Sequence, residues 1–317
     1  MEQILVTGGA GFIGSHTCEA LLNKEFSVLC IDDFNSYYDP KIKEKNIEQA
    51  LKNHNFALYK IGITDKEALT KVFQENKISK IIHLAARAGV RASFEDKELY
   101  ELVNIEGTRN LLELAKEFKI KNFVFGSSSS VYGTNTKIPF SEIDKTENQI
   151  SPYAKTKKAA ELLCKEYHDN FNLDITCLRF FTVYGPRGRP DMAIYKFTKL
   201  INEGKEIEVY GNTKSKRDYT FVTDIVDGIL SALKENLGFE IINLGDSNPI
   251  EIKYLIGLIE QELNQKAKIK VIKEQRGDVD ITYAEISKAK KLLGYEPKIK
   301  IEQGIKLFVK WFKKEAV

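Results

Sequence analysis

A glycine-rich turn near the N-terminus constrains the fold of this chain more than any other stretch. Residues 4–6 are apolar and predict a strand, and residues 12–24 have the periodicity of a helix. Between them, Gly8 suits a tight turn, Gly11 lets the backbone approach a phosphate, and Gly14 lets the helix pack closely on the sheet. Because the N-terminus of the helix then faces the phosphates, we predict a dinucleotide site rather than a glycine turn without a ligand.

The second apolar run, residues 28–31, ends in the acidic pair Asp32 and Asp33. A carboxylate at the end of the second strand of a dinucleotide fold hydrogen-bonds the ribose diol. The same negative charge repels the 2′-phosphate of NADP, and Asp33 adds to this repulsion. The sequence therefore predicts NAD as the cofactor.

Length and charge limit the kinds of protein that this chain can be. A chain of 317 residues is long for one compact core, so we expect two lobes that share a cleft. The net charge is only +3 and the charges are interspersed, which argues against a nucleic-acid partner. No apolar run approaches the roughly 20 residues that span a bilayer, and the N-terminus enters the first strand directly. We therefore expect a cytoplasmic protein without a membrane partner.

The four cysteines, Cys18, Cys30, Cys164 and Cys177, lie in apolar segments without Cys-x-x-Cys spacing. This pattern is typical of reduced, buried cysteines rather than of zinc ligands or disulfides. We expect no metal.

Strands and helices alternate through the first half of the chain. Residues 57–61 and 80–84 predict strands, and a helix capped by Thr64 and Asp65 lies between them. Small residues follow the second of these strands, as a close approach of backbone to a cofactor requires, and residues 94–118 predict one long amphipathic helix. This alternation predicts a parallel sheet.

Residues with catalytic potential follow the next predicted strand, residues 122–125. The serines at 127–130 lie at the carboxyl edge of the sheet, where open parallel sheets bind ligands. Tyr153 and Lys157 are four residues apart at the start of a predicted helix and therefore share one face. A nearby ammonium stabilises a phenolate, which would lower the pKa of a tyrosine from about 10 toward the range of a general base. The alternative is a surface Tyr–Lys pair, against which the glycine turn and the serines argue.

These motifs together resemble the extended short-chain dehydrogenase/reductases, and among them the nucleotide-sugar 4-epimerases. The resemblance covers essentially the whole chain. It rests on the glycine turn, the serine segment ending at 131–133, the Tyr153-x-x-x-Lys157 pair, and residues 178–186, 216–224 and 276–279. It implies an α/β fold, in which a Rossmann doubly wound parallel sheet carries a smaller α/β substrate-binding lobe. The implied domains are residues 1–180 for NAD and 181–317 for a UDP-sugar, and the chain can cross back between them.

The resemblance also assigns the catalytic and cofactor-binding residues. Ser128 would hydrogen-bond the reacting sugar oxygen, Tyr153 would act as the base, and Lys157 would hold the nicotinamide ribose. The implied NAD contacts are Gly8, Gly11, Phe12, Ile13, Asp32, Asn35, Ile63, Leu84, Ala85, Ala86, Asn104, Tyr153 and Lys157. Gly62 stands where the family commonly has an aspartate that touches the adenine amine.

The second half of the chain has less regular periodicity and predicts the substrate lobe. Its expected elements are helices at about 192–203, 223–234, 250–263 and 301–314 and a strand at 208–210. By the resemblance, Arg217 and Arg276 would clamp the UDP diphosphate, since guanidinium groups match phosphate geometry. The family usually places the second arginine one residue earlier, where this chain has Gln275.

The segment 181–193 most closely resembles that of UDP-glucuronate 4-epimerases, in which Thr182 and Arg189 would meet the C6 carboxylate. A guanidinium suits a carboxylate, and such a contact contributes roughly 1.5–3 kcal/mol. Arg187 is a further candidate for the substrate. In the alternative interpretation, both arginines are ordinary loop residues or serve the diphosphate.

The neighbouring positions leave a second sugar open. Thr282 lies where a bulky tyrosine in some UDP-galactose 4-epimerases excludes a C2 N-acetyl group, so its small size leaves room for UDP-N-acetylglucosamine. Ser128 and Ser129 would face the sugar in either case. The resemblance ranks UDP-glucuronate first, UDP-N-acetylglucosamine second and UDP-glucose third.

The predicted reaction is an inversion at C4 through a transient 4-keto sugar, with no net use of NAD. Dehydratases and decarboxylases of this type carry a carboxylate just before the closing Val-Tyr-Gly, where this chain has Ser129 and Ser130. A non-catalytic NAD-binding regulator would not need Ser128, Tyr153 and Lys157 together. The helices at 94–118 and 153–171 form the dimer interface in the family, so we also expect a homodimer.

Overall fold

A parallel sheet of seven strands forms the centre of the protein. The computed structural model describes residues 2–211, 213–273 and 279–315. The strands are β1 (Gln3–Thr7), β2 (Ser27–Ile31), β3 (Phe56–Tyr59), β4 (Ile78–His83), β5 (Asn122–Ser128), β6 (Ile175–Phe180) and β10 (Phe239–Leu244). Their order across the sheet is β10-β6-β5-β4-β1-β2-β3, and every neighbouring pair is parallel. The order reverses after β1, which is the arrangement of a doubly wound Rossmann sheet, as the sequence predicted.

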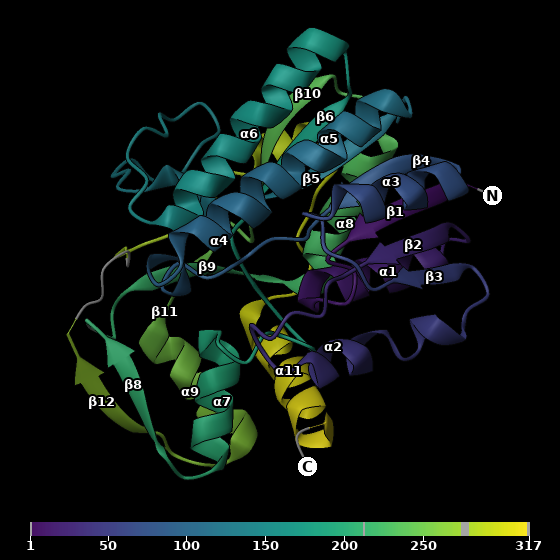
Figure 1. Cartoon of the computed structure of the whole chain (residues 1–317). Helices are drawn as coiled ribbons and strands as arrows, with labels where there is room; N and C mark the ends of the chain where they lie inside the picture. Colours follow the sequence, from purple (N-terminus) through teal and green to yellow (C-terminus); the bar gives the residue numbers. More distant parts are fainter. Residues whose placement is uncertain (1, 212, 274–278, 316–317) are drawn as a thin grey trace.

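Helices cover both faces of this sheet (Figure 1). One face carries α1 (Phe12–Leu22) and α8 (Val222–Lys234), and the other carries α3 (Lys66–Glu75), α5 (Gly107–Glu117) and α6 (Pro152–Phe171). Side chains alternate along β1, so that Ile4 and Val6 pack in the first of these cores and Leu5 packs in the second. Strands that are buried on both faces read as continuous apolar runs, which is why the sequence identified them.

The predicted single helix at 94–118 is interrupted in the structure. A 3₁₀ turn (Ala92–Phe94) and α4 (Lys97–Glu101) lead into a π-helical turn, Leu102–Glu106, before α5 begins. The π turn contains the buried residue Asn104, whose side-chain amide hydrogen-bonds the backbone of Arg87. This long-range contact is formed where the regular helix is interrupted, and the apolar periodicity of the segment does not reveal it.

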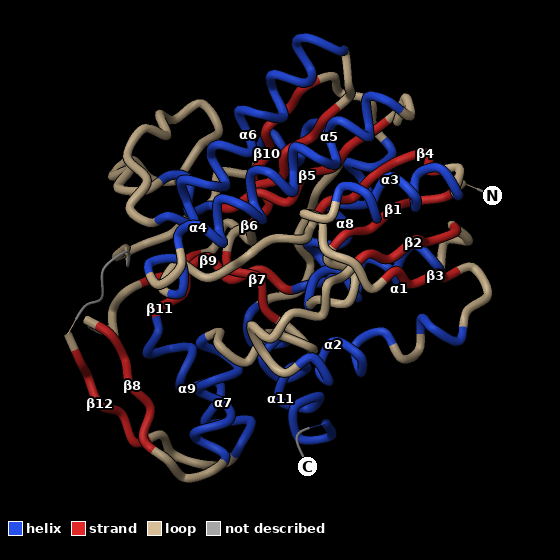
Figure 2. The backbone as a smooth tube through the Cα atoms, viewed as in Figure 1, coloured by secondary structure: helices blue, strands red, loops and turns tan. Residues whose placement is uncertain are grey.

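The smaller lobe contains two short sheets and three helices among the described residues. Strands β7 (Thr182–Tyr184), β9 (Lys216–Phe221) and β11 (Pro249–Glu251) form one sheet, and β8 (Glu206–Tyr210) pairs with β12 (Lys268–Ile272). The helices are α7 (Ala193–Asn202), α9 (Ile252–Leu263) and α11 (Ile301–Glu315). Figure 2 shows the β8–β12 pair at the far end of this lobe, away from the central sheet. The chain crosses back twice: α8 and β10 lie with the first sheet, and α10 (Ser287–Leu293) packs against both of them.

Asp218 ties the segments of the smaller lobe together. Its carboxylate is fully buried and accepts hydrogen bonds from the backbone N–H groups of Asp246, Ser247 and Ala284, at 2.8, 3.0 and 2.9 Å. One side chain on β9 therefore fixes the loop after β10 and the segment before α10. None of the helices in the ranges described above is long and apolar enough to cross a membrane.

Candidate active site

A cleft of about 220 Å³ lies at the carboxyl ends of the central strands. It contains nearly all the residues that the sequence assigned to the cofactor. These are Gly8, Gly11, Phe12, Ile13, Asp32, Asn35, Ile63, Leu84, Ala85, Ala86, Tyr153 and Lys157. They come from separate strand ends and helix starts, which the parallel topology brings to one edge of the sheet.

The glycine turn closes one side of the cleft. Gly8 has φ +69°, and a Cβ there would lie 2.7 Å from the backbone nitrogen of Ala85, so only glycine fits. A Cβ on Gly14 would collide with the carbonyl oxygen of Gly8. Helix α1 begins after Gly11 without a side-chain cap, which leaves its first backbone N–H groups for an anion in the cleft. The turn therefore fits the pyrophosphate of a dinucleotide.

Asp32 lies in the cleft and is buried. Its Oδ1 accepts hydrogen bonds from the Phe34 N–H (3.0 Å) and from the ammonium of Lys43 (2.8 Å), while Oδ2 accepts from the Ala10 N–H (3.2 Å). A carboxylate has about four acceptor positions, so one on Oδ2 is left for a ribose hydroxyl. Lys43 is a residue that the sequence analysis missed, because it comes from α2 (Pro40–Ile47), in the excursion between β2 and β3.

The structure does not bring Asn104 to the cleft. Its Oδ1 accepts from the Arg87 N–H (2.8 Å), and its amide nitrogen donates to the Arg87 carbonyl (3.0 Å) and to the hydroxyl of Thr156 (3.0 Å). These bonds use the amide and fix the strand-end loop. Arg87 in turn donates from Nη1 to Asn35, at 3.0 Å, within the cleft. Asn104 thus positions a residue that faces the cofactor groove.

Tyr153 and Lys157 lie in the first two turns of α6, which Ser151 caps by accepting a hydrogen bond from Ala154 N–H (3.1 Å). The expectation that Lys157 lowers the pKa of Tyr153 is wrong for this structure. Burial raises the pKa of Tyr153, and the opposing effects come from the Ser128 hydroxyl and the charge of Arg189. Lys157 instead donates to the carbonyl of Gly126, at 2.7 Å, and burial lowers its own pKa to about 8.

Beneath the serines lies a buried ion pair that the sequence analysis also missed. Arg179 donates from Nε and Nη2 to the two carboxylate oxygens of Glu161, both at 2.8 Å, and both side chains are fully buried. The hydroxyl of Ser127 donates to the same carboxylate, at 2.6 Å. Because Ser127 precedes Ser128, this pair holds the end of β5 on which Ser128 lies.

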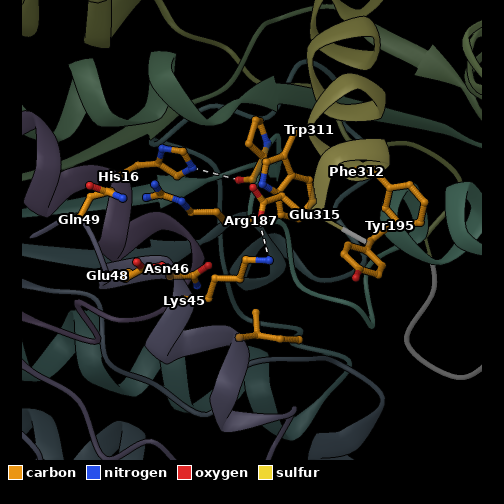
Figure 3. Close-up of a pocket in the computed structure, with 12 residues that line it drawn as sticks. His16, Lys45, Asn46, Glu48, Gln49, Arg187, Tyr195, Trp311, Phe312 and Glu315 are labelled. Atoms are coloured by element: carbon orange, nitrogen blue, oxygen red, sulfur yellow. Dashed lines mark hydrogen bonds and ion pairs between the residues drawn. The ribbon is translucent and has the colours of Figure 1, made fainter. Parts of the chain in front are cut away.

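Arg189 and Arg187 point to different sites. Arg189 lines the cleft, where its guanidinium pairs with Asp191. Arg187 pairs with Glu19 of α1, at 2.7 Å, and lines a separate cavity of about 300 Å³ between α1, α2 and α11. Figure 3 shows this second cavity, with Lys45 and Glu315 paired across it. The structure does not place Arg187 at the cleft, because its left-handed backbone (φ +64°) turns the loop between the two arginines.

The other substrate candidates lie outside the cleft or beyond the described residues. Ser129 begins the short 3₁₀ helix after β5, and Thr182 begins β7. Arg217 on β9 donates to the carbonyls of Lys216 and Asp280, and the hydroxyl of Thr282 accepts from the Asp218 N–H, at 3.0 Å. Arg276 and Gln275 lie outside the described residues. Among the residues that the structure describes, no group of three or more His, Cys, Asp or Glu side chains could hold a metal ion.

The fold and the site together define an extended short-chain dehydrogenase/reductase, with a dinucleotide groove and a Tyr–Lys pair at the sheet edge. The family model described as GDP-mannose 4,6 dehydratase matches residues 5–308. The chain belongs to this family.

Three similar proteins indicate which members of the family this chain resembles. The UDP-glucuronate 4-epimerase of Thermodesulfobacterium geofontis is 48% identical over 314 residues, which cover 99% of this chain and 97% of that protein. The crystal structure of UDP-glucuronic acid 4-epimerase from Bacillus cereus, in complex with UDP-glucuronic acid and NAD, has a TM-score of 0.94 and 38% identity over 98% of this chain and 99% of that one. The UDP-N-acetylglucosamine 4-epimerase of Methanobrevibacter ruminantium has a TM-score of 0.91 and 30% identity, over 99% of both chains.

Proposed function

We propose that this protein is an NAD-dependent UDP-glucuronate 4-epimerase. One observation carries the choice of substrate: Arg189 lines the same cleft as Tyr153, and its charge acts on that tyrosine. C6 of a hexuronate is two bonds from C4, so a cation beside the base of a C4 reaction is placed for a C6 carboxylate. The high identity to named UDP-glucuronate 4-epimerases supports the same choice.

The residues of the groove fit NAD. The N-terminus of α1 suits the pyrophosphate, Asp32 suits the ribose diol, and Lys157 lies where it can hold the nicotinamide ribose. When bound there, NAD supplies reversible acceptance of a hydride. Asp32 and Asp33 oppose a 2′-phosphate, which supports NAD over NADP.

The protein's own residues transfer the proton and orient the sugar. Tyr153, as phenolate, takes the proton of the sugar 4-OH as C4 is oxidised to a ketone, and returns it after the hydride comes back to the opposite face. The Ser128 hydroxyl lies within hydrogen-bonding reach of Tyr153, which supports a contact from Ser128 to the reacting oxygen. Because strong contacts to the hexose in the ground state would resist its turning, we assign the tighter grip to the UDP part, with Arg217 and Arg276 as its ligands.

The alternatives differ in chemistry and can be ranked. The small Thr282, and the similarity to a UDP-N-acetylglucosamine 4-epimerase, favour that sugar as the second candidate and UDP-glucose as the third. Dehydration and decarboxylation each need a second acid or base, and the positions just before Val131 hold Ser129 and Ser130 rather than carboxylates. A regulator that only binds NAD would leave the Ser128, Tyr153 and Lys157 set without a purpose.

We also propose a homodimer in the cytoplasm. Helices α5 and α6 lie side by side on one face of the sheet. Leu102, in the π turn that leads into α5, is 50% exposed, and Leu162 on α6 is 58% exposed. Apolar side chains of this size on adjacent helices are suited to a subunit interface. The four cysteines are buried and unpaired, which suits a reducing compartment.

One assay tests the function. Purified protein is incubated with UDP-glucuronate, UDP-N-acetylglucosamine and UDP-glucose in turn, and the C4 epimers are separated and quantified. We expect UDP-galacturonate from the first substrate, with no loss of water or carbon dioxide by mass spectrometry. If UDP-glucuronate is inert and UDP-N-acetylglucosamine is epimerised, the second candidate replaces the first.

A further inference from the structure

The guanidinium of Arg189 is held on one edge by a carboxylate two residues away. Its Nε donates to Oδ1 of Asp191, at 2.9 Å, and its Nη2 donates to Oδ2, at 2.6 Å. This is a bidentate pair within one loop, so the chain itself keeps the guanidinium and the carboxylate close together. Nη1 makes no hydrogen bond to any other residue that the structure describes.

Tyr37 fixes this pair from the cofactor side of the cleft. Its hydroxyl donates to Oδ2 of Asp191, at 3.3 Å, and the guanidinium carbon of Arg189 lies 5.4 Å from the centre of its ring. Tyr37 can lie there because Gly89, with φ +102°, has no side chain; a Cβ on that residue would collide with the Tyr37 hydroxyl. Two side chains from two loops, those of Asp191 and Tyr37, thus set the direction of the Arg189 guanidinium.

The charges of the pair persist at neutral pH. Burial acts to raise the pKa of Asp191, but the hydrogen bonds and charge of Arg189 outweigh it, so the pKa lies below its ordinary value. Arg189 keeps its proton throughout the working range. A guanidinium has five N–H groups, and Asp191 engages two of them, so the edge formed by Nη1 and Nη2 can hold a second carboxylate.

We propose that Asp191 is a positioning residue for selectivity: it holds Arg189 so that the open Nη edge receives the C6 carboxylate of the substrate. This inference rests on the proposed function. The structure favours it over a competing role, in which the substrate would displace Asp191. The competing role would need a carboxylate from solution to replace one that the loop and the Tyr37 hydroxyl already hold in place.

The test compares selectivity rather than rate alone. In wild type, Asp191→Ala and Asp191→Asn, kcat/KM is measured for UDP-glucuronate, and UDP-glucose is used as the uncharged reference, as substrate or as competitive inhibitor. We expect Asp191→Ala to lower the preference for UDP-glucuronate about tenfold, mainly through KM, with the constants for UDP-glucose changed by less than about twofold. Asp191→Asn keeps one acceptor for the guanidinium, so its preference for UDP-glucuronate should lie between those of wild type and Asp191→Ala.

Glu48→Gln is the matched control, because it removes one exposed carboxylate that lines the separate cavity and not the cleft. Its preference should equal that of wild type. The inference is overturned if both Asp191 variants keep the wild-type preference. It is also overturned if the preference rises, because that result would make Asp191 a competitor of the substrate. If wild type does not epimerise UDP-glucuronate at all, the proposed function fails and this inference fails with it; if wild type is active, the variants test the inference alone.

Discussion

Arg187 and Arg189 are two residues apart in one loop and pair with carboxylates in two different cavities. Arg187 reaches Glu19 on α1, and Arg189 reaches Asp191 beside the catalytic cleft. The two side chains are chemically identical and of similar exposure, but Arg187 lines the separate cavity and Arg189 lines the cleft. Arg187 is therefore an internal control for the proposal that Arg189 contacts the C6 carboxylate of the substrate.

We predict that Arg189→Ala reduces the preference for UDP-glucuronate over UDP-glucose by about tenfold or more, because one charge-assisted contact is lost. Arg187→Ala should leave this preference unchanged and cost about 0–1 kcal/mol of stability, as expected for a partly exposed ion pair. The ratio of kcat/KM values checks the first statement, and a urea titration checks the second. Equal loss of preference in both variants would contradict the assignment.

Tyr153→Phe tests the base. The variant keeps the ring, which packs edge-on against Tyr100 at 6.3 Å, and removes only the ionisable oxygen. We expect turnover to fall by about 10²–10⁴-fold, while the amount of NAD that copurifies stays the same. Near wild-type turnover at neutral pH would show that another group takes the proton.

The pH profile of the wild type gives a second test of this base. Burial raises the pKa of Tyr153, so kcat/KM should rise with pH above neutrality as the phenolate forms. The rate is measured at fixed ionic strength from pH 6 to about 7.5, below the pKa of about 8 at which Lys157 itself would lose its charge. A profile that falls with rising pH over this range would contradict a phenolate base.

The buried pair of Glu161 and Arg179 should dominate the stability of the active-site edge. Glu161→Gln leaves the Arg179 charge without a counter-charge in the interior, which costs about 3–5 kcal/mol when one partner of such a pair is removed. It also weakens the acceptor for Ser127, so turnover should fall with stability. Urea unfolding and steady-state rates measure the two effects.

Asp169, further along α6, provides the matched control for Glu161→Gln. Asp169 pairs with Lys165 at 2.9 Å, and both side chains are about half exposed. Asp169→Asn removes the same charge but should change stability by less than about 0.5 kcal/mol. A similar loss in both variants would mean that burial is not the cause.

The sequence predicted the parts of the site that depend on local chemistry. The glycine turn, the Asp32 strand end and the Tyr153–Lys157 pair are each formed within a few residues, so their spacing, taken together, identifies them as candidates. The parallel topology then brings them to one edge. Because the structure has no room for a side chain at Gly8, this position requires glycine, and the sequence shows the requirement directly.

The parts that the sequence missed depend on contacts between distant segments. Lys43 reaches Asp32 from a helix in the excursion after β2, and Glu161 meets Arg179 only because α6 packs on β6. The direction of Arg187 depends on one left-handed residue conformation, which a non-glycine residue rarely adopts. Asn104 was assigned to the cofactor by the family resemblance, and the π turn at which its amide bonds Arg87 is not visible in the apolar pattern.

Two buried carboxyls in the smaller lobe make stability depend on pH. Burial raises the pKa of Asp218 to about 6, and it raises the pKa of Asp246 to about 6, with the neighbouring Asp218 charge acting in the same direction. Asp246 is 7% exposed, and the ammonium of Lys300 is 3.6 Å from its Oδ1. Aspartate in an unfolded chain has a pKa of about 3.9. Between these values the folded protein binds more protons than the unfolded chain, so the stability from this protonation is complete below pH ~4 and is lost as pH rises through ~6.

Asp246→Asn should therefore gain stability relative to wild type as pH rises from 4 to 7, because asparagine resembles the protonated carboxyl and never ionises. The difference in unfolding free energy should grow by on the order of 2–3 kcal/mol, from a shift of about two pK units. Thermal or urea unfolding at several pH values between about 4 and 7 measures it. Asp227→Asn, which removes an exposed carboxylate from α8, is the control and should show a difference from wild type that stays flat with pH. If the difference in unfolding free energy between Asp246→Asn and wild type stays flat or falls with pH, burial does not disfavour the ionised form of Asp246.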